Sequence, residues 1–201
     1  MTQDIPHSIA QVLAEITALW SGAARNRRSP FHTPIVCTVR DLTPAPRVMV
    51  LRAASDDGIH FRFHTDARSP KTAELGADGP IALLGYDPDL RVQLTVRGNG
   101  RIERESLHAE TAWEGSALSS RRCYLAAHPP GTPVSQPISG LPDHLLDRSP
   151  TEAESHDGRT NFAVLMIEAQ ELEWLKLTSC GNKRAVFRRD GDQWVGQWIT
   201  P

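Results

Sequence analysis

The chain has 201 residues, of which 39% are hydrophobic, and a formal net charge of -2. This size and composition allow one domain with a substantial core and do not fit a disordered or fibrous protein. The 22 basic and 24 acidic residues leave no excess positive charge to attract a nucleic-acid backbone or an anionic membrane. The sequence therefore predicts a single domain over residues 1–201, with neither nucleic acid nor membrane as a partner.

The three cysteines indicate a reducing compartment. Cys37, Cys123 and Cys180 are odd in number, widely spaced and without metal-ligand spacing. The first residues include an early acid and no basic patch before an apolar run, and no long uncharged apolar stretch follows. We expect a cytoplasmic protein with no disulfide framework and no metal site.

The first predicted element is an amphipathic helix. Ser8 and Gln11 have the spacing of a capping box, and one helical face is apolar, with Ile9, Val12, Leu13, Ile16, Leu19 and Trp20. Short β-rich runs follow at 35–39, 47–52, 59–64, 81–86 and 90–104. Turn residues lie at 44–46 and 56–58, and a short helix is expected over 69–75. This pattern is typical of an antiparallel meander.

The second half of the chain adds helices and returns to strands. Helical segments are expected over 105–114 and 119–127, followed by a loop rich in Pro and Gly at 129–142. Strand-like runs come last, at 162–168, 185–189 and 193–199. Closing such strands into a barrel would protect their edges. The predicted fold class is mainly β with helices (α+β), an antiparallel barrel with an N-terminal helix.

Two neighbouring segments carry residues suited to a phosphate. Arg47 and Arg52 stand at the two ends of one apolar run, and strand parity would point them to opposite faces. Residues 63–71 then combine a strand end, hydroxyls, a helix start at Ser69 and Lys71 in the first turn. A helix N-terminus with a nearby lysine and arginine suits a phosphate dianion. The alternative, which spacing alone favours, is that Ser69 only caps the helix and Lys71 is solvated.

Three further residues are notable only together. The amide of Gln93, within the long strand run, has a donor and an acceptor for the edge of a heterocycle. Trp174 and Arg184 flank the turn at 178–183, where they either line a cleft or cover the end of a barrel. Taken singly, such polar residues are more often found on a solvated surface.

The ordered set of these residues resembles the pyridoxamine 5'-phosphate oxidase family, and more closely its FMN-binding, oxidase-related branch. The resemblance spans nearly the whole chain and includes the segments 27–32 and 118–124. The matching positions are Arg47-Val-Met-Val-Leu-Arg52, His64-Thr65, Ser69-Pro-Lys71, Gln93, Trp174 and Arg184. The resemblance implies an FMN-binding split β-barrel and a homodimer with two flavin sites at the subunit interface.

The resemblance also implies roles for individual residues. Arg47, Ser69 and Lys71 would hold the flavin phosphate. Val50 and Leu51 would lie along the ring, Arg52 would replace the family's lysine near its polar edge, and Thr65 would hydrogen-bond nearby. Two positions depart from the family: His64 stands where an aromatic residue is common, and Pro70 where arginine is common. Contacts that come partly from the second subunit match Gln93, Gln136, Trp174 and Arg184.

One departure concerns the substrate. Family oxidases carry an Arg-x-His pair just before the arginine matched here by Arg184, and this chain has Cys180-Gly-Asn182 instead. A thiol cannot replace a guanidinium as a phosphate clamp, nor an amide a titrating imidazole. We therefore expect an FMN-dependent oxidoreductase with a small-molecule substrate or electron donor other than a vitamin B6 phosphate. The alternatives are a flavin-binding or flavin-storage module without turnover and a related barrel that holds haem, although the histidines show no ligand spacing.

Overall fold

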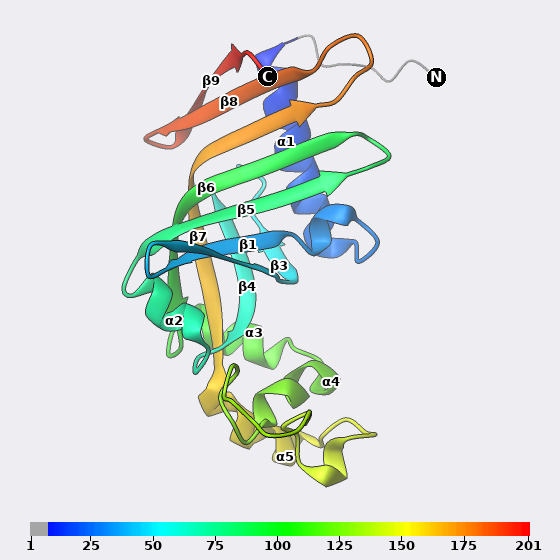
Figure 1. The fold of residues 1–201 in the computed structure, drawn as a ribbon, viewed down its shortest axis with the longest axis vertical. Helices are drawn as coiled ribbons and strands as arrows, with labels where there is room; N and C mark the ends of the chain where they lie inside the picture. The colour runs from blue at the N-terminus through cyan, green and yellow to red at the C-terminus, as the bar shows by residue number, and fades with distance from the viewer. Residues whose placement is uncertain (1–7) are drawn as a thin grey trace.

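The computed structural model describes residues 8–201, and its centre is one antiparallel sheet of nine strands. The main path runs β2-β1-β5-β6-β7-β4-β3, while β8 pairs with β7 and β9 with β8. In Figure 1 the sheet is strongly twisted, and α1 crosses behind it. The strands are β1 Ile35–Arg40, β2 Thr43–Val48, β3 Leu51–Ala54, β4 His60–Asp66, β5 Gly79–Asp87, β6 Val92–Glu103, β7 Phe162–Lys176, β8 Lys183–Asp190 and β9 Gln193–Ile199.

Helix α1 spans Ile9–Arg25 and confirms the predicted capping box. The backbone N–H of Gln11 donates to Ser8 Oγ at 3.2 Å, and the backbone N–H of Ser8 donates to Gln11 Oε1 at 3.1 Å. Its buried face packs into the barrel core, where the Trp20 ring lies 5.4 Å from Phe31 and 5.6 Å from Phe61 between ring centroids. The helix therefore closes one side of the sheet with aromatic packing.

The predicted strand at 47–52 is wrong as a single element, and its interruption explains the split barrel. Strand β2 ends at Val48 and β3 begins at Leu51, so only Met49 and Val50 separate them. Yet β2 and β3 stand at the two ends of the strand order. Because the three peptide units from Val48 to Leu51 span at most about 10 Å, the two edges of the curved sheet must approach each other here. Arg47 and Arg52 consequently lie on different strands, and the parity argument does not apply.

The Pro-Ala-Pro segment at 44–46, predicted as a turn, lies inside β2. The turn instead uses Asp41 and Leu42, whose φ angles of 49° and 63° are the positive values that a tight hairpin turn requires. Proline lacks a backbone donor, and it is tolerated here because β2 is an edge strand.

A helical module lies beyond one end of the barrel, at the bottom of Figure 1. It has its own small core, in which Trp113 and Tyr124 both contact Phe162, with ring centroids 5.2 and 5.0 Å away. The predicted helix at 119–127 divides into a short α-helix and a 3-10 turn. The helical elements not yet given are α2 Pro70–Leu75, α3 Leu107–Glu114, α4 Leu118–Arg121 and α5 Glu152–Ser155, with 3-10 turns η1 Pro30–His32, η2 Arg122–Leu125, η3 Asp143–Leu145 and η4 His156–Asn161.

Strand β7 joins the module to the barrel. It is longer than the predicted run at 162–168 and pairs with β4, β6 and β8 along its length. The predicted class, mainly antiparallel β with helices and an N-terminal helix, is confirmed. Within residues 8–201, no helix has the length and apolar character needed to cross a membrane.

Candidate cofactor and substrate site

The predicted phosphate residues come together at the junction of β4 and α2. Lys71 Nζ donates to Thr65 Oγ1 at 2.9 Å and to Ser69 Oγ at 2.7 Å. Ser69 is the N-cap of α2, but its side chain makes no capping hydrogen bond. Its hydroxyl therefore serves the lysine rather than the helix. We call Arg47, Thr65, Ser69 and Lys71 the phosphate cluster.

Arg47 joins the phosphate cluster from β2 and is held by a buried carboxylate. Its guanidinium donates to Thr38 and, at 2.8 Å, to Glu74 Oε2. The Glu74 side chain is only 4% exposed and also binds Arg40. Burial raises the pKa of Glu74, but hydrogen bonds from Thr38, Arg40 and Arg47 outweigh it and leave the pKa below its usual value. Glu74 is thus a carboxylate that positions Arg47.

The electrostatics of the phosphate cluster favour an anion. Burial lowers the pKa of Lys71, and the positive charge of Arg47 lowers it further, while Asp66 and Glu74 act in the opposite direction. A dianionic ligand beside Lys71 and Arg47 would stabilise both charged forms. Two cations and two hydroxyls at one place fit the phosphate of FMN.

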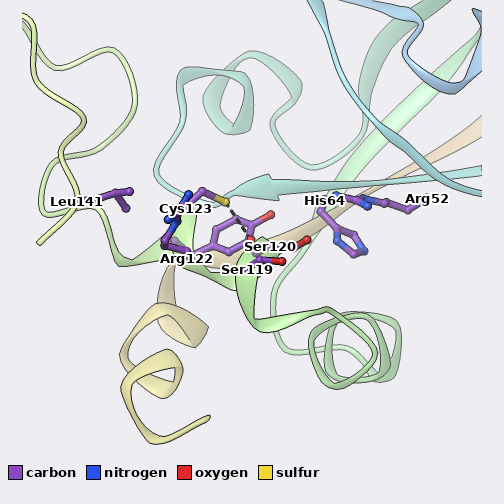
Figure 2. Close-up of a pocket in the computed structure, with 8 residues that line it drawn as sticks. Arg52, His64, Ser119, Ser120, Arg122, Cys123 and Leu141 are labelled. Carbon is purple, nitrogen blue, oxygen red and sulfur yellow. Dashed lines mark hydrogen bonds between the residues drawn. The ribbon is translucent and has the colours of Figure 1, made fainter. Parts of the chain in front are cut away.

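Arg52 and His64 lie on a different surface, toward the helical module. They line a cavity of about 280 Å³ with Ser119, Ser120, Arg122, Cys123, Tyr124 and Leu141. In Figure 2, Arg52 and His64 lie together at one end of this cavity, and Arg122 and Cys123 approach from the chain after α4. Cys123 Sγ donates to the carbonyl of Ser120 at 3.3 Å. The cavity therefore lies between the barrel and the helical module.

His64 is held neutral in this position. Burial, and then the positive charges of Arg52 and Arg62, lower the pKa of His64 from 6.5 to about 3. Its ring packs edge-on against Phe162 with centroids 5.0 Å apart, and Nε2 is buried without a hydrogen-bond partner among the described residues. An imidazole in this position does not act as an acid at neutral pH.

This pKa predicts a pH dependence of stability that His64→Gln removes. Between the unfolded pKa of 6.5 and the folded pKa of about 3, only the unfolded chain binds the proton. The contribution of a neutral His64 to stability is present above 6.5 and falls as the pH drops, by at most about 1.4 kcal/mol per pH unit. Urea unfolding of both proteins at neutral and mildly acidic pH measures the difference. Parallel pH profiles would contradict the lowered pKa.

Gln93 and Arg184 meet in a third region, on the outer face of the barrel. They line a cavity of about 560 Å³ together with Glu173, Thr95 and apolar residues of β1 and β5. The register of β6, β7 and β8 places these two residues in one row across the sheet, because Gln93 is opposite Leu175 and Leu175 is opposite Arg184. Arg184 Nε donates to Glu173 Oε1 at 3.0 Å. Gln93 and Arg184 therefore lie beside one another in one chain, together with Glu173, an acidic neighbour that was not predicted.

Trp174 is not part of this cavity. It is fully buried in the barrel core and contacts the ring of Trp198, with centroids 6.3 Å apart. Because neighbouring residues of a strand point to opposite faces, Trp174 faces inward while Glu173 faces the cavity. Of the two alternatives for Trp174, lining a cleft beside Arg184 does not hold within one chain, because the side chain is buried in the core.

The remaining predicted residues have contrasting positions. Val50 is partly exposed between β2 and β3, whereas the side chain of Leu51 is fully buried in the core. Only the backbone of Leu51 is thus available to a ring. Gln136 is exposed in the loop of the helical module and lines neither of the two cavities described above. The predicted residues form three groups: the phosphate cluster, Arg52 with His64, and Gln93 with Arg184. Val50, Leu51, Gln136 and Trp174 lie outside these groups.

Sequence reasoning missed several residues at these sites. Thr38 and Glu74 position Arg47, and Glu173 and Arg97 accompany Arg184. Arg62 flanks His64 and lowers its pKa. Arg62 and His64 are two residues apart on β4, so strand parity would have placed them on one face. The positions of Glu74 and Glu173 depend on long-range packing and had no local signal.

Comparison with known proteins gives a distant relative and two structures with the same fold. No family model matches the chain. A pyridoxine/pyridoxamine 5'-phosphate oxidase of Cyanothece sp. is 25% identical over 167 residues, which cover 81% of this chain and 75% of that protein.

Two solved structures share the fold. One is a pyridoxamine 5'-phosphate oxidase-related, FMN-binding protein of Nostoc punctiforme, with a TM-score of 0.67, 19% identity and coverage of 98% of this chain and 100% of that chain. The other is PhzG of Burkholderia lata in complex with tetrahydrophenazine-1-carboxylic acid, with a TM-score of 0.68, 20% identity and coverage of 98% and 95%. The predicted resemblance is confirmed: the chain has the split-barrel fold of the pyridoxamine 5'-phosphate oxidase-related FMN-binding proteins.

Proposed function

We propose that the protein binds FMN and acts as an FMN-dependent oxidoreductase. The observation that carries the proposal is the phosphate cluster, in which Lys71, two hydroxyls and the ion-paired Arg47 converge. Its supporting comparison is the Cyanothece oxidase, whose similarity extends over most of both chains. The site requirements of a flavin phosphate and the residues present agree in charge and in hydrogen-bonding capacity.

In this proposal the residues bind and orient rather than react. Lys71, Ser69 and Arg47 hold the phosphate, while the chain at Val50 and Leu51 borders the ring and Arg52 lies near its polar edge. FMN supplies the capacity to accept or donate a hydride when bound. Because its lowered pKa keeps His64 neutral, the ring carries one N–H and does not act as a cationic acid. The protein's contribution is positioning and electrostatics.

We also propose that the working form is a homodimer, in the cytoplasm. Outward-facing residues of β1, β2 and β5 form an apolar exposed face, with Ile35, Val39, Val48, Leu84 and Tyr86. Exposed apolar faces of this kind are typical of protein interfaces, and a two-fold dimer buries the same patch on both subunits. The cavity with Gln93 and Arg184 opens beside this face, so a second copy would cover it.

Three free cysteines support a reducing compartment.

Light scattering of the flavin-loaded protein tests the dimer. We expect twice the mass of one chain at micromolar concentration. Leu84→Asp on the exposed face should shift the mass toward one chain, since an unpaired charge in a buried interface is costly. Leu107→Asp, at an exposed position on α3, is the matched control and should leave the mass unchanged. A flavin-loaded monomer in the unsubstituted protein would contradict the proposal.

Turnover separates the oxidoreductase from a second candidate, a flavin-binding or flavin-storage module. The turn with Cys180 and Asn182 favours the module, because it lacks the charged pair that engages substrate in the oxidases that the chain resembles. The test is anaerobic reduction of the loaded protein by nicotinamide cofactors, followed by reoxidation with oxygen. Reduction and reoxidation faster than for free FMN support the enzyme. Rates equal to those of free FMN support the module.

A further inference from the structure

A row of alternating charges crosses β6, β7 and β8 on the outer face of the barrel. We call it the charge row; its members, in order, are Arg188, Glu171, Arg97, Glu173 and Arg184. The register places Arg97 and Arg188 directly opposite Glu171 on its two neighbouring strands. Glu171 accepts from Arg97 Nη1 at 2.6 Å and from Arg188 Nε at 3.2 Å. This half of the row is an ordinary set of cross-strand pairs.

Glu173 departs from this arrangement. The register places the uncharged residues Thr95 and Val186 opposite it, so its two ion pairs run diagonally across the sheet. Its Oε1 accepts from Arg184 Nε at 3.0 Å, and its Oε2 accepts from Arg97 Nη1 at 3.2 Å. Glu173 therefore joins two arginines that the register alone would not pair with it.

Glu173 is also an ionised carboxylate within a cavity. Its side chain is only 7% exposed, and it lines the cavity of about 560 Å³ that contains Gln93 and Arg184. Burial raises the pKa of Glu173, but hydrogen bonds from Arg184 and Arg97 outweigh it and leave the pKa below its usual value. A buried ion pair often gives no more stability than an apolar pair of similar size. Stability alone therefore does not account for this carboxylate.

The ion pair fixes the orientation of the Arg184 guanidinium. Arg184 is held through Nε, and its Nη1 and Nη2 atoms have no hydrogen-bond partner among residues 8–201. Because a guanidinium is planar and its five N–H donors have a fixed geometry, holding one edge sets the direction of the others. Arg184 lines the cavity beside Gln93. The cavity thus contains an oriented guanidinium whose terminal donors are available to a ligand.

We propose that Glu173 is a positioning residue for FMN, which holds the guanidinium of Arg184 in the orientation that binds the flavin. The proposal rests on the proposed function, since it assigns Glu173 a role toward that cofactor. The resemblance matches Arg184 with a flavin contact, whereas the role of Glu173 follows from the ion pair and the cavity. Glu173 acts through Arg184, so its loss should have no further effect once Arg184 is removed.

A double-mutant cycle tests this dependence. FMN is titrated into the flavin-free forms of Glu173→Gln, Arg184→Gln and the double variant, and quenching of flavin fluorescence gives each affinity. Arg184→Gln should weaken FMN by roughly ten- to a hundredfold, the loss of one charge-assisted contact. Glu173→Gln should cause a smaller loss, and the double variant should match Arg184→Gln alone, because residues that act as one unit are not additive.

Glu171→Gln is the matched control. It removes the same charge from the neighbouring position of the charge row, but Glu171 does not line the cavity. Its FMN affinity should stay close to that of the unsubstituted protein. The visible circular dichroism of bound FMN, which reports how the ring is held, should change in the same way in Glu173→Gln and Arg184→Gln and should not change in Glu171→Gln.

Arg184→Lys gives an independent test if Glu173→Gln does not fold. It keeps the positive charge but removes the Nε donor and the planar fork, so it should bind FMN about as weakly as Arg184→Gln. Binding equal to that of the unsubstituted protein would show that orientation of the guanidinium is unimportant.

Several results would overturn the proposal while leaving FMN binding intact. They are additive losses in the double variant, an equal loss in Glu171→Gln, or unchanged affinity and circular dichroism in Glu173→Gln. If the unsubstituted protein takes no FMN, the proposed function fails and the role of Glu173 fails with it. Binding of FMN by the unsubstituted protein therefore distinguishes the two failures.

Discussion

Lys71→Ala is expected to weaken FMN binding by roughly ten- to a hundredfold while changing riboflavin binding much less. The Lys71 ammonium lies between the hydroxyls of Thr65 and Ser69 at 2.9 and 2.7 Å, and in the proposed site its charge meets the phosphate that FMN has and riboflavin lacks. Loss of such a charge-assisted contact costs on the order of 1.5–3 kcal/mol. Quenching of flavin fluorescence during titration of the flavin-free protein measures both affinities.

Arg47→Ala should have the same selectivity, and Arg40→Ala is its matched control. Both arginines bind Glu74, but the Arg40 side chain is 53% exposed on the surface and Arg47 is 23% exposed within the phosphate cluster. Arg40→Ala removes one Glu74 partner without removing a phosphate ligand, so FMN affinity should stay close to that of the unsubstituted chain. Equal losses of FMN and riboflavin in Lys71→Ala and Arg47→Ala would show that these residues only support the fold.

Pyridoxamine 5'-phosphate is expected not to reduce the bound flavin at a useful rate. The turn between β7 and β8 has Cys180 and Asn182 where the resemblance requires an arginine and a histidine. The side chain of Asn182 is engaged locally, since its Oδ1 accepts from the backbone N–H of Thr178 at 3.2 Å. A substrate without its orienting charge would seldom present the reacting carbon to the ring.

The measurement is anaerobic mixing of the oxidised, FMN-loaded protein with saturating pyridoxamine 5'-phosphate. Flavin absorbance should persist on the timescale in which dithionite, added to a matched sample, bleaches it completely. Rapid stoichiometric bleaching by the amine would mean that other residues orient this substrate, and vitamin B6 oxidation would then become the leading function.

Local patterns were sufficient for α1, because the apolar face of 9–20 and its capping box are short-range features. The hydroxyls and lysine of 65–71 were only compatible with a phosphate site: their spacing alone favoured a solvated Lys71, and the resemblance to the oxidase family selected the phosphate. The apolar run from Arg47 to Arg52 also predicted one strand. The segment instead belongs to two strands, β2 and β3, because the curved sheet must bring its edges together at Met49 and Val50.

The positions of other residues depend on the long-range register of the strands, which local sequence patterns do not predict. Trp174 belongs to the same matched set as Arg184, yet the register of β7 points it into the core beside Trp198. Arg62 was not predicted as a site residue, because an arginine in a strand is usually solvated. Arg27 and Ser116 line the same cavity as Arg62 and come from distant segments, so only the packing of the helical module against β4 creates this cavity.

The visible absorption spectrum of the purified protein tests the central claim most directly. A flavin spectrum is expected, with a released cofactor that is FMN rather than riboflavin and a stoichiometry of one per chain after saturation. The proposed role of the phosphate cluster predicts this result, because an unphosphorylated flavin offers no comparable partner to its lysine, arginine and hydroxyls. A haem spectrum, or a protein that stays colourless after incubation with excess FMN and gel filtration, would contradict the account.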